Sequence, residues 1–364
     1  MRVLFTVNIP SPYRIDFFNE LGKFCELTVL FESKIDRSRN KKWIADNAIN
    51  FKSIFMRGIK YKDAEGFCPE IFRYLSLKKF DLIVIGAYHT PTGMMAIEYM
   101  NFRKIPFILS TDGGIKKADN RIKYFIKKHF ISSAKLWLST GEITNDYLEY
   151  YGAKKESIFI YPFTSVKQNE ILNQISSREE RLQLRKGLGI KEEKVIISVG
   201  QFTYRKGYDL LLKAWQGIGD EYGLYIIGGR ATEEYINLTR QLNLKNVHFI
   251  DFMTKSELSK YYQSADLFVL PTREDIWGLV INEALSYGLP VITTDKCVAG
   301  CELVKNNSVG TIVSINNFEI FNEEFKKAIN NCYSPCDCLK VANEYTIEKM
   351  AKCHIEIFNK GLNL

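Results

Sequence analysis

Residues 267–294 read LFVLPTREDIWGLVINEALSYGLPVITT, and this stretch predicts a strand, a loop, a helix and a second strand in direct succession. The apolar run at 267–270 predicts the first buried strand, and a second apolar run at 291–294 predicts the other. The helix is expected to begin near Gly278 and to end at Gly288-Leu-Pro290, because glycine followed by proline commonly terminates a helix. Repeated units of this kind build parallel sheets.

Short apolar runs alternate with helical stretches along the rest of the chain as well. Expected strands lie at 2–7, 26–31, 81–86, 106–110, 135–139 and 157–161, and then at 195–199, 224–227, 247–250, 267–270, 291–294 and 311–313. These runs are continuously apolar, as expected of strands that helices cover on both faces. The sequence therefore predicts an α/β protein with two doubly wound, Rossmann-like parallel-sheet domains that face a central cleft.

The length of 364 residues suits two domains, which we expect at 1–165 and 166–340. A terminal segment at 341–364 is predicted to contain one amphipathic helix over 346–360. No apolar run approaches the roughly 20 residues that cross a bilayer, and the amino terminus is typical of a first strand rather than a signal peptide. A cytoplasmic protein is expected.

The net charge of +8 is concentrated in the first half of the sequence. Residues 1–165 contain 26 Lys and Arg against 17 Asp and Glu, whereas the remainder contains 24 against 25. A basic stretch at 116–128 with neighbouring aromatic residues is compatible with an anionic membrane surface, and equally with an ordinary solvated helix. No nucleic-acid-binding module is recognisable, so a nucleic-acid partner is not expected.

Eight cysteines in a chain without a secretion signal are expected to be reduced thiols. A zinc site is the alternative for one group, which consists of Cys332, Cys336, Cys338, Cys353 and His354. Its spacing matches no familiar arrangement of CxxC pairs, which favours inert thiols.

The start of the helix near Gly278 is a candidate anion site. The backbone N–H groups of Gly278, Leu279 and Val280 have no partners within the helix, and the helix dipole adds positive potential suited to a diphosphate. Glu283, in the second turn, is expected to accept hydrogen bonds from ribose hydroxyls, and Asp275 to hold hydroxyls of a sugar. The alternatives are a helix-capping Asp275 and a solvated Glu283.

A second polar patch follows the expected strand at 195–199. Gly200 begins a loop that delivers Arg205 and Lys206 just before a helix, where adjacent cations would meet bound phosphates. Two solvated loop cations are the alternative. The chain contains neither a GxxxxGK[ST] loop nor a GxGxxG turn after a strand, which argues against a nucleotide hydrolase and a dinucleotide oxidoreductase.

No Asp-x-Asp triplet, which many sugar transferases use to hold a divalent metal, occurs in the sequence. The helix start, Lys206 and Arg205 would then stabilise a diphosphate leaving group, at roughly 2.7–4 kcal/mol for each well-placed donor. We therefore expect neither a metal nor another cofactor.

These two patches resemble glycosyltransferase family 4, a large group of retaining GT-B enzymes that includes the group 1 glycosyltransferases of cell-surface polysaccharide synthesis. The acidic motif of that family is matched in order by Asp275, Glu283, Ala284, Gly288, Pro290 and Val291. Asp275 replaces the more usual glutamate. Gly200 and Lys206-Gly207 match the phosphate loop, in which Gln201 stands where an arginine is expected and Arg205 is placed to compensate.

The resemblance implies roles for further residues. Asp275, Lys206, Arg205 and His89 are expected at the reacting donor sugar and its phosphates, with Glu283 on the ribose. The segment 8–14 resembles the first-strand loop of the polysaccharide-building subgroup. The acceptor side is expected to include Pro12, Tyr13, Asp112 and Gly113. The final helix is expected to pack back on the first domain.

The predicted function is retaining, metal-independent transfer of a sugar from a UDP- or GDP-sugar to a glycan or lipid-linked acceptor. The resemblance implies that the departing phosphate oxygen takes the acceptor proton. Two alternatives remain open: a nucleotide-sugar 2-epimerase on the same scaffold, and a non-catalytic scaffold at a membrane surface with a degenerate nucleotide cleft.

Overall fold

Two parallel sheets organise the chain in the computed structural model, which describes residues 1–34, 47–60 and 65–362. The first sheet has the strand order β3-β2-β1-β6-β7-β8-β9, and the second has the order β12-β11-β10-β13-β14-β15. Strands of the first sheet are β1 (Arg2–Val7), β2 (Glu26–Phe31), β3 (Lys52–Phe55), β6 (Leu82–Ile85), β7 (Ile108–Ser110), β8 (Leu136–Ser139) and β9 (Ile158–Ile160). Strands of the second sheet are β10 (Lys194–Val199), β11 (Tyr222–Ile227), β12 (Val247–Ile250), β13 (Leu267–Leu270), β14 (Val291–Thr294) and β15 (Gly310–Val313).

Helices connect the strands and cover both faces of each sheet. In the first half and at the carboxyl end they are α1 (Pro12–Leu21), α2 (Pro91–Arg103), α3 (Arg121–Ser132), α4 (Glu142–Tyr150) and α13 (Ile347–Leu362). Those around the second sheet are α5 (Arg178–Leu188), α6 (Tyr208–Ala214), α7 (Glu233–Gln241), α8 (Lys255–Ser264), α9 (Leu279–Ser286), α10 (Val298–Leu303), α11 (Phe318–Ala328) and α12 (Pro335–Glu344).

The chain divides into two compact units, each with one sheet. Met1–Lys167 together with Tyr345–Leu364 forms the first unit, and Gln168–Glu344 forms the second. The chain thus passes between units at 167 and 344, against the expected 165 and 340. The difference at the second crossing arises because α12, which the sequence analysis did not identify, packs against α9 in the second unit.

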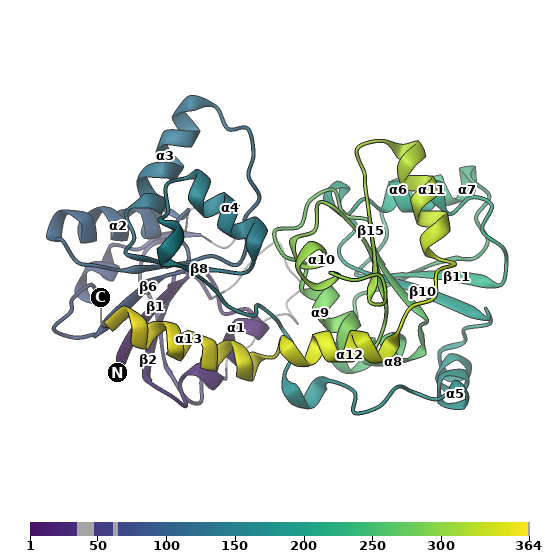
Figure 1. Cartoon of the computed structure of the whole chain (residues 1–364), viewed down its shortest axis with the longest axis horizontal. Helices are drawn as coiled ribbons and strands as arrows, with labels where there is room; N and C mark the ends of the chain where they lie inside the picture. The colour runs from purple at the N-terminus through teal and green to yellow at the C-terminus, as the bar shows by residue number, and fades with distance from the viewer. Residues whose placement is uncertain (35–46, 61–64, 363–364) are drawn as a thin grey trace. The chain divides into compact units, whose positions relative to one another are not determined.

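In the first unit, α13 lies along α1 on one face of the sheet, and α2, α3 and α4 lie on the other (Figure 1). The core between the sheet and α2, α3 and α4 includes the fully buried Trp137 and Tyr151. In the second unit, α6, α7 and α11 share a core around Trp215 and Phe325 on one face of the sheet. Helices α5, α8, α9 and α12 lie on its opposite face (Figure 1).

Three short strands were not expected from the sequence. Strand β3 extends the first sheet at its edge, and β4 (Ile59–Lys60) pairs antiparallel with β5 (Gly66–Phe67). Their apolar content is low and they are two to four residues long, so no apolar run identified them. Among the described helices, none is both long and apolar enough to span a membrane.

Each sheet has one point where the order of connections reverses. In the first sheet this point lies between β1 and β6, and in the second between β10 and β13. Ligands of doubly wound sheets bind at the carboxyl ends of the strands that flank such a point. The loops after these four strands are therefore where a functional site is expected.

Candidate functional site

The loops after β10 and β13 are joined by backbone hydrogen bonds. The loop after β10 forms a short 3-10 helix, η5 (Tyr204–Lys206). The carbonyl of Arg205 accepts a hydrogen bond from the Arg273 amide at 2.8 Å and from the Thr272 hydroxyl at 3.0 Å, and the Arg205 guanidinium donates to the carbonyl of Glu274 at 2.8 Å. The two loops therefore form one structure at the switch point of the second sheet.

Gly207, directly after η5, makes this close approach possible. Its φ is 70°, and a Cβ at this position would lie 2.0 Å from the carbonyl oxygen of Pro271. Any larger residue would thus force the η5 turn away from the loop after β13. This steric requirement explains the glycine of the Lys-Gly pair.

Arg273 also stabilises the contact between the loops after β10 and β13. Its guanidinium makes two hydrogen bonds of 2.7 Å to the carboxylate of Asp209 in α6 and lies 3.9 Å from the centre of the Tyr204 ring. The hydrogen bonds to Asp209 raise the pKa of Arg273 above its usual value. Arg273 lies within the stretch 267–294 that predicts the fold, but no sequence pattern gave it a role.

Lys206, Arg205 and Asp275 meet at this junction. Lys206 Nζ lies 2.7 Å from Asp275 Oδ2, and Arg205 Nη1 lies 3.3 Å from the same oxygen. Lys206 and Asp275 are each only 8% exposed, so Lys206 is not a solvated loop cation, whereas Arg205 is exposed. Asp275 is not the cap of α9 either, because Gly278 occupies the N-cap position.

The turn before α9 also requires glycine, at Gly278. Its φ is 107°, and a Cβ there would lie 2.8 Å from Cys297 Sγ. The thiol of Cys297 is fully buried, and burial together with the nearby Asp275 raises its pKa to about 12. Helix α9 begins directly after this turn, so its first amides, including those of Leu279 and Val280, follow three to five residues after Asp275.

Glu283 lies in the second turn of α9 and is half-buried rather than solvated. Its Oε2 accepts a hydrogen bond of 3.1 Å from the hydroxyl of Tyr262. Burial and the Glu283 charge keep the pKa of Tyr262 well above its usual value, so this hydroxyl stays a donor. Tyr262 in turn stacks on Tyr287, with ring centres 5.1 Å apart. The Tyr262 hydroxyl thus fixes the position of the Glu283 carboxylate. No sequence pattern pointed to Tyr262 as part of this site.

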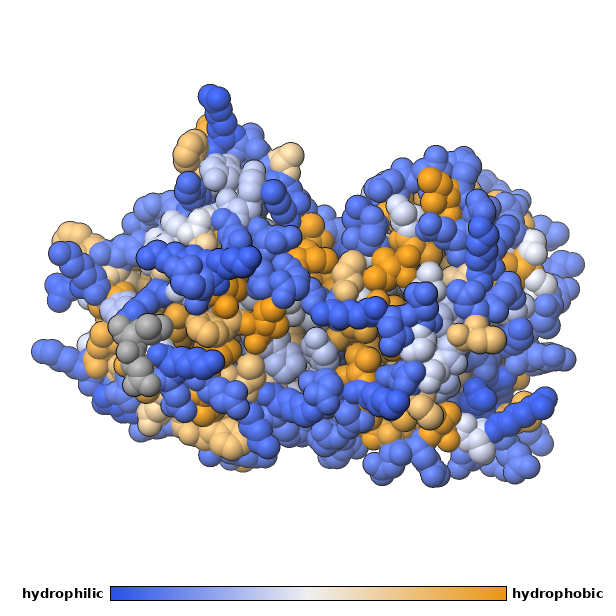
Figure 2. All heavy atoms as spheres, in the orientation of Figure 1, coloured by the Kyte–Doolittle hydropathy of each residue, from blue (hydrophilic) through white to orange (hydrophobic). Residues whose placement is uncertain are grey.

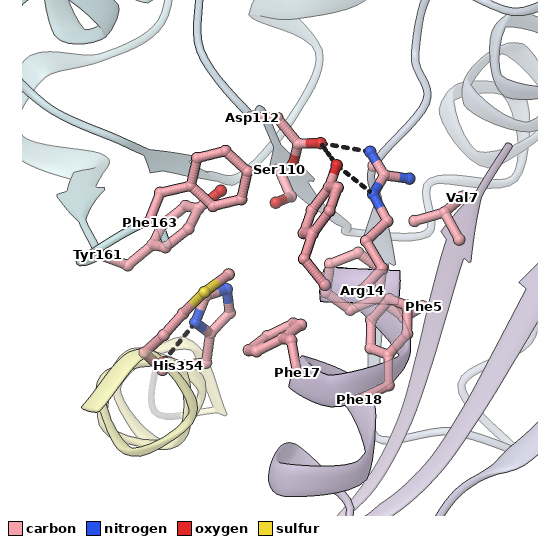
Figure 3. Close-up of a pocket in the computed structure, with 13 residues that line it drawn as sticks. Phe5, Val7, Arg14, Phe17, Phe18, Ser110, Asp112, Tyr161, Phe163 and His354 are labelled. Atoms are coloured by element: carbon pink, nitrogen blue, oxygen red, sulfur yellow. Dashed lines mark hydrogen bonds and ion pairs between the residues drawn. The ribbon is translucent and has the colours of Figure 1, made fainter. Parts of the chain in front are cut away.

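A separate polar cluster occupies the first unit. Tyr13 Oη donates to Asp112 Oδ2 at 3.0 Å, and Arg14 forms an ion pair with the same carboxylate. Figure 3 shows Arg14 and Asp112 above a small pocket, with His354 of α13 below it. The pocket has a volume of about 20 Å³, and Tyr13 also lines it. The structure therefore brings together the expected Tyr13 and Asp112 and adds Arg14 and His354.

The other residues expected on this side are placed around that cluster. Pro12 is the first residue of α1, immediately before Tyr13, and Gly113 follows Asp112 with a φ of 135°. His89 is exposed in the loop after β6 and does not line the pocket beside Asp112. Arg14 belongs to the segment 8–14 that resembles the family's first-strand loop, whereas no sequence signal connected His354 with this cluster.

The cysteines do not gather into a site. All eight carry free thiols, and Cys353 with His354 belongs to the first unit while Cys332, Cys336 and Cys338 belong to the second. Within the part of the chain that the structure describes, no three His, Cys, Asp or Glu side chains are grouped as metal ligands.

Comparison with known proteins places this geometry in a family. Residues 180–344, which include Gly200, Lys206, Asp275 and Glu283, match the model of the family described as glycosyl transferases group 1. A 41.2 kDa protein from the cps region of Klebsiella pneumoniae, itself uncharacterised, is 30% identical over 270 residues, or 70% of each chain. This chain belongs to the group 1 glycosyl transferases.

Other members of the family are more distant. The lipopolysaccharide glucosyltransferase WaaG of Escherichia coli is 26% identical over 202 residues, covering 54% of this chain and 53% of WaaG. For three curated relatives, WaaG among them, the match spans 40% to 63% of their length. The crystal structure of Anabaena Alr3699/HepE in complex with UDP superimposes with a TM-score of 0.76 at 14% identity, covering 99% of this chain and all of the other. The fold is therefore the GT-B fold, as expected from the sequence.

Proposed function

We propose that this chain transfers a sugar from a nucleoside diphosphate sugar, with UDP or GDP as the leaving group, to a glycan or lipid-linked acceptor. The Lys206–Asp275 ion pair beside the Gly278 turn carries the proposal, because it joins fixed cations, a carboxylate and a helix start at one switch point. The second unit would bind the donor, and the Tyr13–Asp112 cluster of the first unit would face the acceptor.

The charges at the pair suit an incoming diphosphate. Lys206 and Arg205 both contact one oxygen of Asp275, so two positive charges face one negative charge. The surplus charge, together with the first amides of α9, would attract phosphate oxygens. Lys206 would then be shared between Asp275 and the phosphate, so Asp275 would be left to accept hydrogen bonds from the transferred sugar.

The departing diphosphate needs charge stabilisation during transfer, and these groups supply it without a metal ion. Each preorganised donor of this kind contributes about 2.7–4 kcal/mol to transition-state stabilisation. Glu283 would bind the ribose hydroxyls. The anomeric configuration would be retained, with the leaving phosphate oxygen taking the acceptor proton on the same face and no protein base required.

Relatives support the choice of substrates. Anabaena Alr3699/HepE has been crystallised with UDP and glucose, and other relatives are named for lipopolysaccharide and O-antigen biosynthesis. The acceptor we propose is accordingly a growing cell-surface glycan or its lipid-linked precursor.

Helix α3 supports a lipid-linked acceptor. Its apolar side chains Ile122, Phe125 and Ile126 are 74%, 63% and 46% exposed. Cationic residues alternate with them along the helix, and Figure 2 shows apolar side chains among hydrophilic ones over α3. A helix with exposed apolar residues beside lysines can lie on anionic lipid. We propose that this face of α3 places the first unit at an anionic membrane surface.

Binding to vesicles tests the membrane contact. Wild-type protein should sediment with vesicles of phosphatidylglycerol and phosphatidylcholine, and Ile122→Ser/Phe125→Ser should reduce binding at least tenfold. Phe102→Ser removes an exposed apolar residue from α2 and serves as the matched control. Equal binding by all three proteins would refute a role for α3.

Turnover of a panel of UDP- and GDP-sugars with a chelator present tests the reaction. Release of UDP or GDP that depends on an acceptor, and that persists in the chelator, is the expected result. Product with inverted configuration, or activity restored only by a divalent cation, would refute the corresponding part of the proposal. Interconversion of donor epimers without transfer would instead indicate a 2-epimerase, and vesicle binding without nucleotide-sugar binding a scaffold.

A further inference from the structure

Glu32 is a buried carboxylate in the first unit that the sequence analysis did not assign to any site. It follows β2 and is only 7% exposed. Its Oε1 accepts a hydrogen bond of 2.6 Å from the hydroxyl of Thr90, and its Oε2 accepts one of 2.9 Å from the amide of Gly66 in β5. Its own amide donates to the carbonyl of Asn8 at 3.1 Å. Glu32 thus contacts the loops after both β1 and β6, which flank the switch point of the first sheet.

The Thr90 end of this contact holds the loop that carries His89. Thr90 is the N-cap of α2, where its hydroxyl accepts a hydrogen bond from the amide of Gly93 at 3.0 Å. The loop folds tightly onto this cap, since a Cβ on Gly93 would lie 2.0 Å from the carbonyl oxygen of Ala87. On the other side of His89, the hydroxyl of Tyr88 is hydrogen-bonded to that of Tyr147. An exposed His89 therefore stands between two anchored neighbours.

The Gly66 end is also connected to α2. The hydroxyl of Thr92, two residues after the cap, donates to the carbonyl of Gly66 at 2.6 Å and accepts from the amide of Cys68 at 3.0 Å. Glu32 and Thr92 thus clamp β5 to the start of α2. This clamp fixes where α2 begins, and with it where the preceding loop lies.

We propose that Glu32 is a positioning residue that orients the loop of His89 through its hydrogen bond to Thr90. This inference rests on the proposed function and on the expectation, drawn from the family resemblance, that His89 lies at the donor sugar. Glu32 would touch no substrate itself; it would act by fixing the position of an exposed side chain whose placement determines the rate.

The protonation of Glu32 bears on this role. Burial raises its pKa from the usual 4.5 to about 7, against the opposing effect of the hydrogen bonds from Thr90 and Gly66. The charged groups that face it are Glu65, which raises the pKa, and Arg14 of α1, which lowers it, while the thiol of Cys68 donates to its carbonyl.

The Thr90 hydroxyl links this protonation to the loop. It has one proton and two acceptors within reach, Glu32 Oε1 at 2.6 Å and the Ala87 carbonyl at 2.9 Å. Ionised Glu32 accepts a hydrogen bond from this hydroxyl, which keeps its own proton. Neutral Glu32 can instead donate a hydrogen bond to Thr90 Oγ1, and the hydroxyl is then free to donate to the Ala87 carbonyl. The hydrogen bonding at the start of the His89 loop would therefore change near neutral pH.

Steady-state kinetics of Glu32→Ala, Thr90→Val and His89→Ala, alone and combined, test the proposal. Glu32→Ala should lower kcat about tenfold or more with the donor KM nearly unchanged. Glu32→Ala/His89→Ala should be no slower than His89→Ala, because both substitutions remove the same contribution to kcat, that of a correctly placed His89. Full kcat in Glu32→Ala, or independent effects that multiply in the double variant, would overturn the positioning role.

The pH profile separates positioning from loss of structure. Glu32→Gln keeps partners for Thr90 and Gly66 but does not titrate, so kcat should stay within about threefold of wild type while an inflection near pH 7 disappears. Glu192→Gln, which alters a carboxylate bonded to Tyr225 and His248 in the second unit, should keep the inflection. If Glu32→Gln and wild type showed the same inflection, the protonation of Glu32 would not control the loop that carries His89.

Two measurements that need no catalytic turnover distinguish failure of the positioning role of Glu32 from failure of the proposed function. The NMR signal of the His89 ring should shift in Glu32→Ala and stay unchanged in Glu192→Gln, even if no sugar is transferred. A raised carboxyl pKa means that the folded state holds a proton between pH 4.5 and about 7. The stability of wild type relative to Glu32→Gln should therefore fall as pH rises through that window, and an unchanged difference would contradict the burial argument.

Discussion

Lys206 Nζ lies 2.7 Å from Asp275 Oδ2, although 69 positions separate the two residues in sequence. The distance is short because β10 and β13 are neighbours in the second sheet, and because Gly207 lets the two following loops touch. Burial of both side chains makes the pair a fixed part of the fold. The groups proposed to bind a diphosphate are thus placed before any ligand arrives, which lowers the cost of ordering them on binding.

Lys206→Met is expected to damage both stability and transfer. Removal of Lys206 leaves the buried Asp275 carboxylate with only the exposed Arg205 as a cationic partner, which costs up to about 3–5 kcal/mol of unfolding free energy. Loss of the cation should also lower kcat roughly a hundredfold. Urea unfolding and steady-state kinetics measure the two effects separately.

A double variant tells these effects apart. Lys206→Met/Asp275→Asn also removes the carboxylate charge that has lost its buried partner, so it should regain most of the lost stability while turnover stays at the level of Lys206→Met or below. If the double variant recovered activity along with stability, Lys206 would be a structural residue and the proposed phosphate contact would be wrong.

The fold was predictable from sequence because continuous apolar runs and glycine–proline helix ends are local signals. The expected strands of the second sheet, such as 247–250 and 291–294, coincide with β12 and β14. Strand β3 was missed because KSIF is short and half polar; its place is fixed only by pairing with β2.

The candidate site was predictable in its residues but not in its contacts. Loop residues such as Lys206 and Asp275 follow strands, and a parallel sheet brings strand ends together, so their proximity could be inferred. The Tyr262–Glu283 and Arg273–Asp209 bonds depend on how α8 and α6 pack on the sheet, which no local pattern encodes. His354 is a helix residue whose meeting with Phe17 and Tyr161 depends on the path of α13.

Glu283→Ala is expected to weaken use of the donor. A carboxylate that accepts hydrogen bonds from the ribose contributes about 1.5–3 kcal/mol, so kcat/KM for the donor should fall between about tenfold and a hundredfold. Tyr262→Phe removes only the hydroxyl that Glu283 accepts from and is the matched control. It should lower kcat/KM by less than about fivefold, and equal losses in the two variants would mean that Glu283 acts on the fold rather than on the donor.

Gly207→Ala is expected to be far more harmful than Gly189→Ala. Both glycines have the same left-handed conformation, with φ of 70° and 72°, so each alanine carries backbone strain of about 1 kcal/mol. The added Cβ meets nothing within 4 Å at Gly189 but lies 2.0 Å from the Pro271 oxygen at Gly207. Unfolding in urea should show a loss above about 2 kcal/mol for Gly207→Ala only. Similar losses for the two variants would show that the η5 turn and the loop after β13 are not tightly joined.

His354 is expected to make the stability of the protein depend on pH. Its ring is fully buried, Nδ1 is bonded to the Met350 carbonyl at 2.8 Å, and Nε2 has no hydrogen-bond partner among the described residues. Burial lowers its pKa from 6.5 to about 4. The unfolded chain therefore binds a proton between these values and the folded chain does not. Stability from this group is present above pH 6.5 and is lost as pH falls toward 4, by up to about 3 kcal/mol.

Urea unfolding of wild type and His354→Phe between pH 4 and pH 8 measures this dependence. The unfolding free energy of wild type minus that of the variant should decrease as pH falls below 6.5, because only wild type must keep a neutral imidazole in the core. His129→Phe, which removes an exposed histidine from α3, controls for the loss of an imidazole elsewhere. A difference between wild type and His354→Phe that stays constant over this range would mean that the ring is solvated and that α13 packs less closely on α1 than its contacts indicate.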